Sequence, residues 1–223
     1  MVGNQSLSLV KENFMNYILT LLLAFATIMT FAQGEKDFRW ESGDLIFQDL
    51  DCGDMCDAIE AVTQGFGGHK FSHVGLINRV GNAVMVIEAV GPGVRMIPLD
   101  SFLKRTTNKM YVGRVRKEYK PLVGKAIAFS VKQLGKSYDD AFLYDNGKYY
   151  CSELIYDAFQ FAYQGKPFFQ LEPMTFKKPE SSEYFPVWVS YYRDLKMEIP
   201  EGKPGCNPGG LSRSNKIEIV KEL

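Results

Sequence analysis

Only two histidines and four cysteines occur in this sequence of 223 residues, and its 26 basic residues are balanced by 26 acidic ones. A chain with no net charge has no electrostatic bias towards nucleic acid, so we do not expect a nucleic-acid-binding protein. The two histidines and the motif "CGDMC" offer too few ligands for a zinc site, so we expect no metal and no cofactor. Internal repeats, low-complexity tracts and obvious linkers are also missing, which favours a single domain.

The one long uncharged apolar run lies near the amino terminus, over residues 17–31 ("YILTLLLAFATIMTF"). Lys11 precedes this run and the small residue Ala32 ends it, which is the layout of a secretory signal peptide over residues 1–32. The run is shorter than the about 20 residues that cross a bilayer, so an uncleaved membrane anchor is the alternative. No cysteine stands at the expected cleavage site, which argues against a lipid anchor, and Met15 is an alternative start.

Removal of this leader leaves residues 33–223, for which we expect one domain, no stable membrane span and a periplasmic or extracellular location. Oxidising conditions would allow cross-links among three of the cysteines, Cys52, Cys56 and Cys206, if Cys151 stays free. Three pairings are then open, and one cysteine must remain single. Cys52 and Cys56 have the spacing of one helical turn, a poor disulfide geometry, so buried or free thiols remain the alternative.

The hydrophobic pattern alternates between strand-like and helix-like segments. Apolar runs bounded by turn residues predict strands at 42–50, 71–78, 83–90, 93–99 and 109–116. Apolar residues at helical spacing predict helices at 54–65, 121–135 and 151–162, with a helical turn at 101–105. The segment "RVGN" between the second and third strands predicts a hairpin, and the tail from Pro173, rich in proline and glycine, is expected to wrap the surface.

Cys151 begins the last of these helices, in the stretch "GKYYCSELIYDAF". It lies on the same helix face as Leu154, Ile155 and Ala158, so its thiol is expected to point inward. At the start of a helix the dipole and the free backbone N–H groups stabilise a thiolate, and the same groups could hold an oxyanion. Cysteine is also a common small core residue, so a nucleophile is favoured only if a base can reach the thiol.

Only one of the two histidines is a plausible base. His69 lies in the glycine-rich loop "GFGGHKF", whereas His73 lies in an apolar strand, where it needs a polar partner. If the two central residues of "RVGN" form the turn, His73 faces Glu88 across the hairpin, with Cβ atoms about 5 Å apart. A shift of one residue would separate the two side chains, whereas a shift of two would leave them diagonal and within reach. Cys151, His73 and Glu88 would then form an activated-nucleophile triad.

Five segments, "SGDLIF", "FSHVGLI", "VIEAVGPGV", "GKSYDDAF" and "YYCSELIY", resemble in this order the permuted papain-like amidases of the YiiX/YaeF type, a branch of the NlpC-like cysteine hydrolases. The resemblance implies that Cys151 is the nucleophile, His73 the base and Glu88 the third polar residue, while Tyr138 lines the substrate site. It also implies an α+β fold with a papain-like, circularly permuted NlpC-like core, in which an antiparallel sheet packs against helices. Asp44 matches a recurrent family position, which we interpret as structural.

The resemblance implies a hydrolase that cleaves a cell-wall peptide or another amide-linked molecule through an acyl-enzyme on Cys151. The related lecithin:retinol-acyltransferase-like proteins also place histidine before cysteine, so a lipid-directed acyltransferase or esterase is an alternative. The segment "PFFQLEPMTF" could line its lipid pocket. A third alternative is a non-catalytic binding module with the same fold. The Cys52/Cys56 pair and the tail "EGKPGCNPGGLSRSNKIEIV" match no family motif, so they leave the substrate open.

Overall fold

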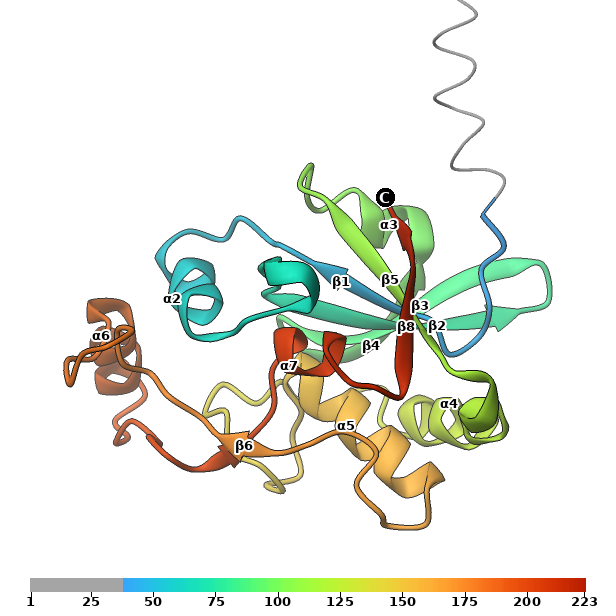
Figure 1. Cartoon of the computed structure of the whole chain (residues 1–223). Coiled ribbons are helices and arrows are strands. Elements are labelled where there is room, and N and C mark those ends of the chain that lie inside the picture. Colours follow the sequence, from blue (N-terminus) through green and yellow to red (C-terminus); the bar gives the residue numbers. More distant parts are fainter. Residues whose placement is uncertain (1–37) are drawn as a thin grey trace, which may run out of the picture. The chain divides into compact units, whose positions relative to one another are not determined.

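Six antiparallel strands form the main sheet of the computed structural model, which describes residues 38–223 (Figure 1). Across the sheet the strand order is β4-β3-β2-β1-β5-β8. The strands are β1 (Leu45–Gln48), β2 (His73–Val80), β3 (Ala83–Val90), β4 (Gly93–Pro98), β5 (Met110–Val115) and β8 (Ile217–Glu222). A second small sheet pairs β6 (Glu172–Pro173) with β7 (Pro204–Gly205). The α+β class with an antiparallel sheet, predicted from the sequence, is confirmed.

Helices lie on both faces of the main sheet. Helices α4 (Val123–Lys132) and α5 (Cys151–Ala162) pack on one face, and the short α3 (Leu99–Leu103) packs on the other (Figure 1). The remaining helices are α2 (Asp54–Val62), α6 (Pro186–Asp194), α7 (Pro208–Ser212) and the 3₁₀ segments Phe66–Gly68 and Lys117–Leu122. Helices α2 and α6 pack against each other beside the sheet. Within residues 38–223, every helix is too short or too polar to cross a membrane.

The alternation of side chains along the strands decides which residues reach α5. In β1, Leu45 and Phe47 join the core beneath α5, whereas Ile46 joins the core beneath α3. Burying a large apolar side chain contributes about 1.5–3 kcal/mol, so this packing fixes α5 and its first residue against the sheet. Residues Trp40–Leu223 form one compact unit, and the signal peptide predicted at residues 1–32 lies outside the described residues.

The tail does more than wrap the surface, so this prediction was wrong for its last part. Strand β8 pairs with β5 along the edge of the main sheet, and Ile217 is buried. The proline and glycine residues of the tail end before this point, and Ile217 and Ile219 alternate with polar residues. Such a segment can therefore pair as a strand with one apolar face.

The β2–β3 hairpin has a different register from the predicted one. Val80 pairs with Ala83 and Leu76 pairs with Ile87, so the turn residues are Gly81 and Asn82. Gly81 has φ 59°, a left-handed conformation that a two-residue hairpin turn requires and that glycine adopts without strain. The shift of two residues means that His73 and Glu88 are not directly opposed, but it keeps both side chains on the same face of the hairpin.

Candidate active site

Cys151 is the first residue of α5, and its side chain is only 7% exposed. The preceding residue, Tyr150, is extended (φ −90°, ψ 169°), so the helix begins abruptly at the cysteine. The carboxylate of Glu153 accepts hydrogen bonds from the backbone N–H groups of Asp145 (3.0 Å) and Tyr150 (3.4 Å), which fixes the loop before the helix. The N–H groups of the first helical turn have no partner within the helix, so they are available beside the thiol.

His73 begins β2 and connects the thiol to an acid. Its Nε2 lies 2.7 Å from Oε2 of Glu88, and its ring is close enough to Cys151 for the thiol to shift its pKa. Because Nε2 faces Glu88, Nδ1 is the ring nitrogen left for the thiol. Burial by itself lowers the pKa of His73, but the hydrogen bonds and charges of Cys151 and Glu88 outweigh it and raise this pKa to about 9.

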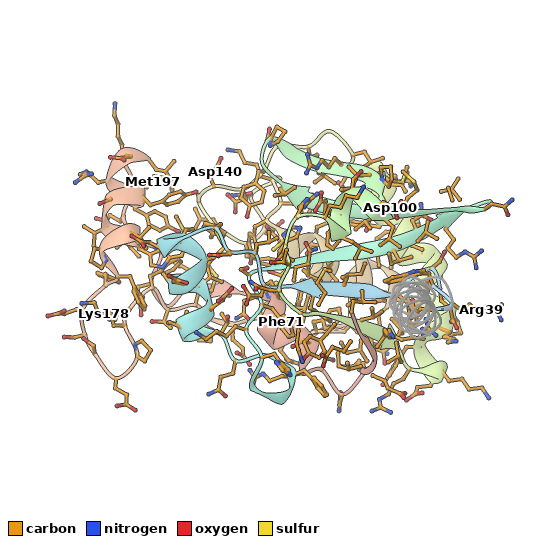
Figure 2. The ribbon with its side chains drawn as sticks, turned by 90° about the horizontal axis from the view of Figure 1, so that it is seen from above. Arg39, Phe71, Asp100, Asp140, Lys178 and Met197 are labelled. Carbon is orange, nitrogen blue, oxygen red and sulfur yellow. A yellow bond between two sulfur atoms is a disulfide. The ribbon has the colours of Figure 1, made fainter. Side chains whose placement is uncertain are left out.

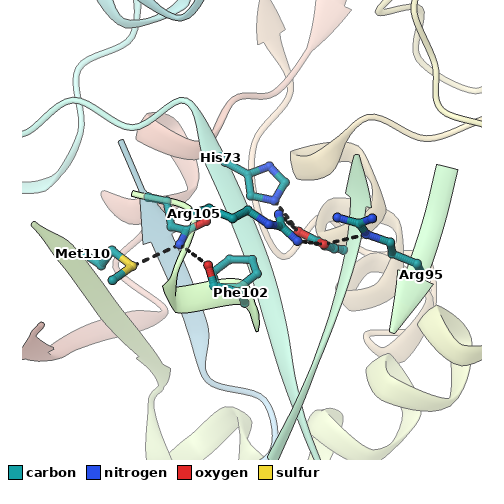
Figure 3. A network of polar contacts seen from close by, with 7 residues as sticks. His73, Arg95, Phe102, Arg105 and Met110 are labelled. Atoms are coloured by element: carbon teal, nitrogen blue, oxygen red, sulfur yellow. Dashed lines mark hydrogen bonds and ion pairs between the residues drawn. The ribbon is translucent and has the colours of Figure 1, made fainter. Parts of the chain in front are cut away.

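Three cationic or cation-forming side chains converge on the carboxylate of Glu88, which is fully buried (Figure 3). Arg95 donates from Nε to Oε1 (2.9 Å), while Arg105 donates from Nη1 to Oε2 (2.5 Å) and from Nη2 to Oε1. Burial would raise the pKa of Glu88, but the bonds from His73 and Arg105 and their charges lower it to about 2. Glu88 is therefore held as an anion with its acceptor positions filled.

Neither arginine was predicted from the sequence. The contact of Arg95 with Glu88 could have been predicted, because the two residues lie directly opposite each other in the β3–β4 hairpin. Opposed residues of opposite charge form cross-strand pairs. The contact of Arg105 could not have been predicted from the sequence. Arg105 follows α3, and it reaches Glu88 only because this short helix packs on the sheet.

Gly75 leaves the space that this arrangement needs. A Cβ atom at this position would lie 2.4 Å from Cγ1 of Val86 and 2.7 Å from the ring of Phe102. The ring of Phe102 in turn lies 5.7 Å from that of His73 and 5.1 Å from the guanidinium carbon of Arg105. The glycine in "SHVG" thus allows Phe102 to support two of the three partners of Glu88, His73 and Arg105.

Tyr138 lies on the wall of a cavity that also contains Cys151. Burial and the nearby charge of Cys151 raise the pKa of the Tyr138 hydroxyl well above its ordinary value, so the hydroxyl remains a neutral donor. The cavity has a volume of about 140 Å³, and most of its wall is apolar or aromatic. Its larger apolar residues are Ile59, Val62, Phe142, Met174, Phe176 and Trp188.

Asp44, Cys52 and Cys56 do not line the cavity of Cys151, whereas Cys206 does. Asp44 is fully buried and forms a two-bond ion pair with Arg114 of β5, at 2.8 Å for each bond, in agreement with its structural interpretation. Cys52 and Cys56 form a disulfide at the start of α2, which selects one of the three open pairings. Cys206 is a buried free thiol. Within residues 38–223, no group of three or more His, Cys, Asp or Glu side chains is placed to hold a metal ion.

In this structure a cysteine begins a helix that packs on an antiparallel sheet, and the strand with the histidine comes earlier in the chain. This arrangement defines a papain-like fold in permuted order. Residues 39–221 match the family described as permuted papain-like amidase enzymes, YaeF/YiiX, C92 family, and the chain belongs to this family. The resemblance noted from the sequence is therefore confirmed.

One relative of known sequence is the uncharacterized protein YiiX of Escherichia coli (strain K12), which is 31% identical over 127 residues. The match covers 55% of this chain and 60% of that protein. A similar solved structure is described as the metalloprotein yiiX from Escherichia coli O157:H7. The TM-score is 0.67 at 24% identity, with 83% of this chain and 99% of that chain covered, and a likeness at this identity shows the fold alone.

Proposed function

We propose that the protein is an exported cysteine amidase or peptidase that hydrolyses a cell-wall peptide or another amide-linked molecule. Its nucleophile is Cys151, its base is His73, and Glu88 orients the base. The observation that supports this proposal is the position of His73, which is hydrogen-bonded to a buried carboxylate and interacts with the thiol at the start of α5. A cysteine kept only for packing would not need a base with an orienting acid.

Each step of the proposed reaction has a residue to perform it. The Cys151 thiolate attacks the carbonyl carbon while His73 holds the proton. Backbone N–H groups at the start of α5 and the Tyr138 hydroxyl donate to the developing oxyanion. The imidazolium of His73 then protonates the leaving amine as the C–N bond breaks, which leaves a thioester on Cys151. A water molecule, deprotonated by His73, attacks the thioester and releases the acid and the free cysteine.

Replacement of the proposed nucleophile and base tests the reaction. We expect Cys151→Ala to abolish hydrolysis of an amide substrate and His73→Ala to lower kcat by at least about 100-fold. His69→Ala is the matched control, because Nε2 of His69 lies 2.8 Å from the Tyr111 hydroxyl and His69 does not pair with Glu88, so this variant should retain activity. Circular dichroism shows whether each variant is folded. Full activity in folded Cys151→Ala would overturn the proposal.

The export proposal has independent support in the Cys52–Cys56 disulfide, because such bonds persist mainly in oxidising compartments. Fractionation of the source cells and mass spectrometry of the purified protein test it directly. We expect a mature chain that begins near Gln33, found outside the cytoplasm. A chain that keeps its first residues and stays in the cytoplasm would contradict export without affecting the proposed chemistry.

A second candidate function is transfer or hydrolysis of a lipid acyl group, because the cavity beside Cys151 is mostly apolar and could hold an acyl chain. Incubation with a phospholipid and with an N-acyl amide separates the two functions. A fatty-acyl adduct on Cys151 from the phospholipid would favour acyl transfer, whereas turnover of the amide alone would favour the amidase.

A further inference from the structure

Arg213 stands apart from the other arginines of residues 38–223, because its guanidinium has no hydrogen-bond or ion-pair partner in the described part of the chain. Each of the others contacts a carboxylate, a backbone carbonyl or another group. These arginines are Arg39, Arg79, Arg95, Arg105, Arg114, Arg116 and Arg193. Arg213 directly follows α7, and it is exposed.

Arg213 lines two clefts, and each of them shares lining residues with the cavity of Cys151. A cleft of about 400 Å³ shares Gly205, Cys206 and Asn207 with the wall of that cavity, and Arg213 lines it. A second cleft, of about 800 Å³, shares Val62 with the cavity, and Arg213 lines it as well. A substrate that extends from Cys151 into either cleft would therefore enter a space that Arg213 lines.

Both clefts carry an excess of positive charge. The smaller one is lined by Arg213 and Lys216 against one acid, Glu172, and the larger one by Arg213, Lys177 and Lys178 against Glu180. The side chain of Lys178 projects from the surface near α6 (Figure 2).

The lysines of these clefts are already engaged. Lys216 donates to the Phe168 carbonyl (2.7 Å), Lys177 lies 3.7 Å from Glu201, and Lys178 lies 3.0 Å from Glu183. Arg213 is thus the cation left available for a ligand.

The cavity itself is unsuited to an anion. Its only charged lining residue among those described is an acid, Glu172, and most of its wall is apolar. A negative group on the acyl part of a substrate would lose its hydration there without gaining a cation. An anion that pairs with Arg213 would therefore belong to a part of the substrate that lies outside the cavity.

We propose that Arg213 is a specificity residue that binds a carboxylate or phosphate on the amine part of the substrate, while the acyl part occupies the apolar cavity. This inference rests on the proposed function for the assignment of the two parts. A planar guanidinium donates two parallel hydrogen bonds to either anion, which a lysine cannot do. The substrate class is then an amide between an apolar acyl group and an anionic amine.

Matched pairs of probes test this assignment by binding, without the need for turnover. N-decanoylglycine and its neutral analogue N-decanoylglycinamide differ only in the carboxylate, and N-decanoyl-phosphoethanolamine and N-decanoylethanolamine differ only in the phosphate. Calorimetry in the Cys151→Ala background gives the dissociation constant of each. We expect at least one anionic probe to bind about 10-fold more tightly than its neutral analogue, because a charge-assisted pair contributes on the order of 1.5 kcal/mol.

Variants of Arg213 show whether this preference comes from the guanidinium. Arg213→Gln should remove the preference and leave the binding of the neutral probe unchanged, whereas Arg213→Lys should keep part of it. Arg193→Gln is the matched control, because Arg193 is also exposed but pairs only with its neighbour Asp194 and lines neither cleft. It should keep the full preference. The pair that shows the larger preference identifies carboxylate or phosphate as the anion.

The inference is overturned if the anionic and neutral probes bind equally well, if none of them binds, or if Arg213→Gln weakens both members of a pair to the same extent. Hydrolysis by the protein with Cys151 intact is measured separately. An Arg213-dependent preference without hydrolysis of any probe would contradict the proposed function and leave the subsite standing. Hydrolysis without any preference for the anionic probes would contradict the subsite at Arg213 and leave the proposed function standing.

Discussion

His73 and Glu88 lie two residues out of register across the β2–β3 hairpin, yet Nε2 of His73 and Oε2 of Glu88 are 2.7 Å apart. A diagonal pair on one face of a hairpin is within the reach of long side chains. The interaction therefore requires that both side chains lie on the same face of the hairpin, which a register shift of two residues preserves. It also requires a side chain as long as that of glutamate. The carboxylate is also clamped by two arginines, which leads to predictions about pH dependence and geometry.

The loss of activity at alkaline pH should follow the deprotonation of His73. Its pKa is raised to about 9, so the imidazolium that protonates the leaving amine in the proposed reaction is present below this pH and lost above it. We expect kcat/KM for an amide to fall above about pH 9. An aryl ester, whose leaving group needs no proton, should not show this loss. Glu88→Gln removes a charge that raises the pKa of His73, so it should move this loss to lower pH by about 1 unit.

Arg105 should matter more than Arg95 for the orientation of Glu88. Arg105 makes two bonds to the carboxylate and its side chain is 19% exposed, whereas Arg95 makes one bond and is 44% exposed. We expect Arg105→Lys to lower kcat by about 10-fold with little change in KM, because a lysine cannot form the two-bond pair. Arg95→Lys is the matched control and should lower kcat by less than about 2-fold. Equal effects in the two variants would show that the two-bond clamp has no special role.

Gly75→Ala should destabilise the fold and displace His73, the proposed base. The new Cβ would overlap Val86 and Phe102, so we expect the free energy of unfolding to fall by about 1–3 kcal/mol. Displacement of Phe102 against His73 should also lower kcat. Gly124→Ala is a suitable control, because a Cβ there meets nothing within 4 Å. Since Gly124 lies in α4, this second variant should be neutral or slightly stabilising in chemical denaturation.

A carboxyl pair near α2 should make stability depend on pH. Burial of Glu60 and the neighbouring charge of Asp49 raise the pKa of Glu60 from 4.5 to about 7. Between these values the folded protein binds more protons than the unfolded chain, so the free energy of unfolding should fall as pH rises from about 4.5 to about 7. Denaturant unfolding at several pH values measures this. Glu60→Gln should make the curve less steep in this window, and Glu198→Gln, at an exposed position, should leave it unchanged.

The Cys52–Cys56 disulfide should contribute only modestly to stability. It closes a loop with a sequence separation of 4, and the entropy removed from the unfolded chain by so short a loop corresponds to about 2 kcal/mol. Unfolding of Cys52→Ser/Cys56→Ser, compared with the parent protein, measures this value. A loss far larger than this would show that the bond has another role, such as holding α2 against the cavity that its residue Ile59 lines.

The sequence by itself determined the fold class, the family and the parity of the hairpin. These rest on local patterns: the period-two strands, the helix that begins at Cys151, and the fact that only His73 among the histidines lies in an apolar strand. Such features follow from the residues nearby in the chain, so they can be predicted without knowledge of distant contacts.

Only the tertiary structure decided the exact register, the clamp by Arg105, the place of β8 in the sheet and the free guanidinium of Arg213 beside the cavity. Each depends on how segments far apart in the chain pack on one another. Arg105 reaches Glu88 because α3 packs on β3 and β4, and Arg213 reaches the clefts because the tail returns past α5 to pair with β5. The hydrophobic pattern shows which face of a segment is buried, but it does not show which distant partner buries it.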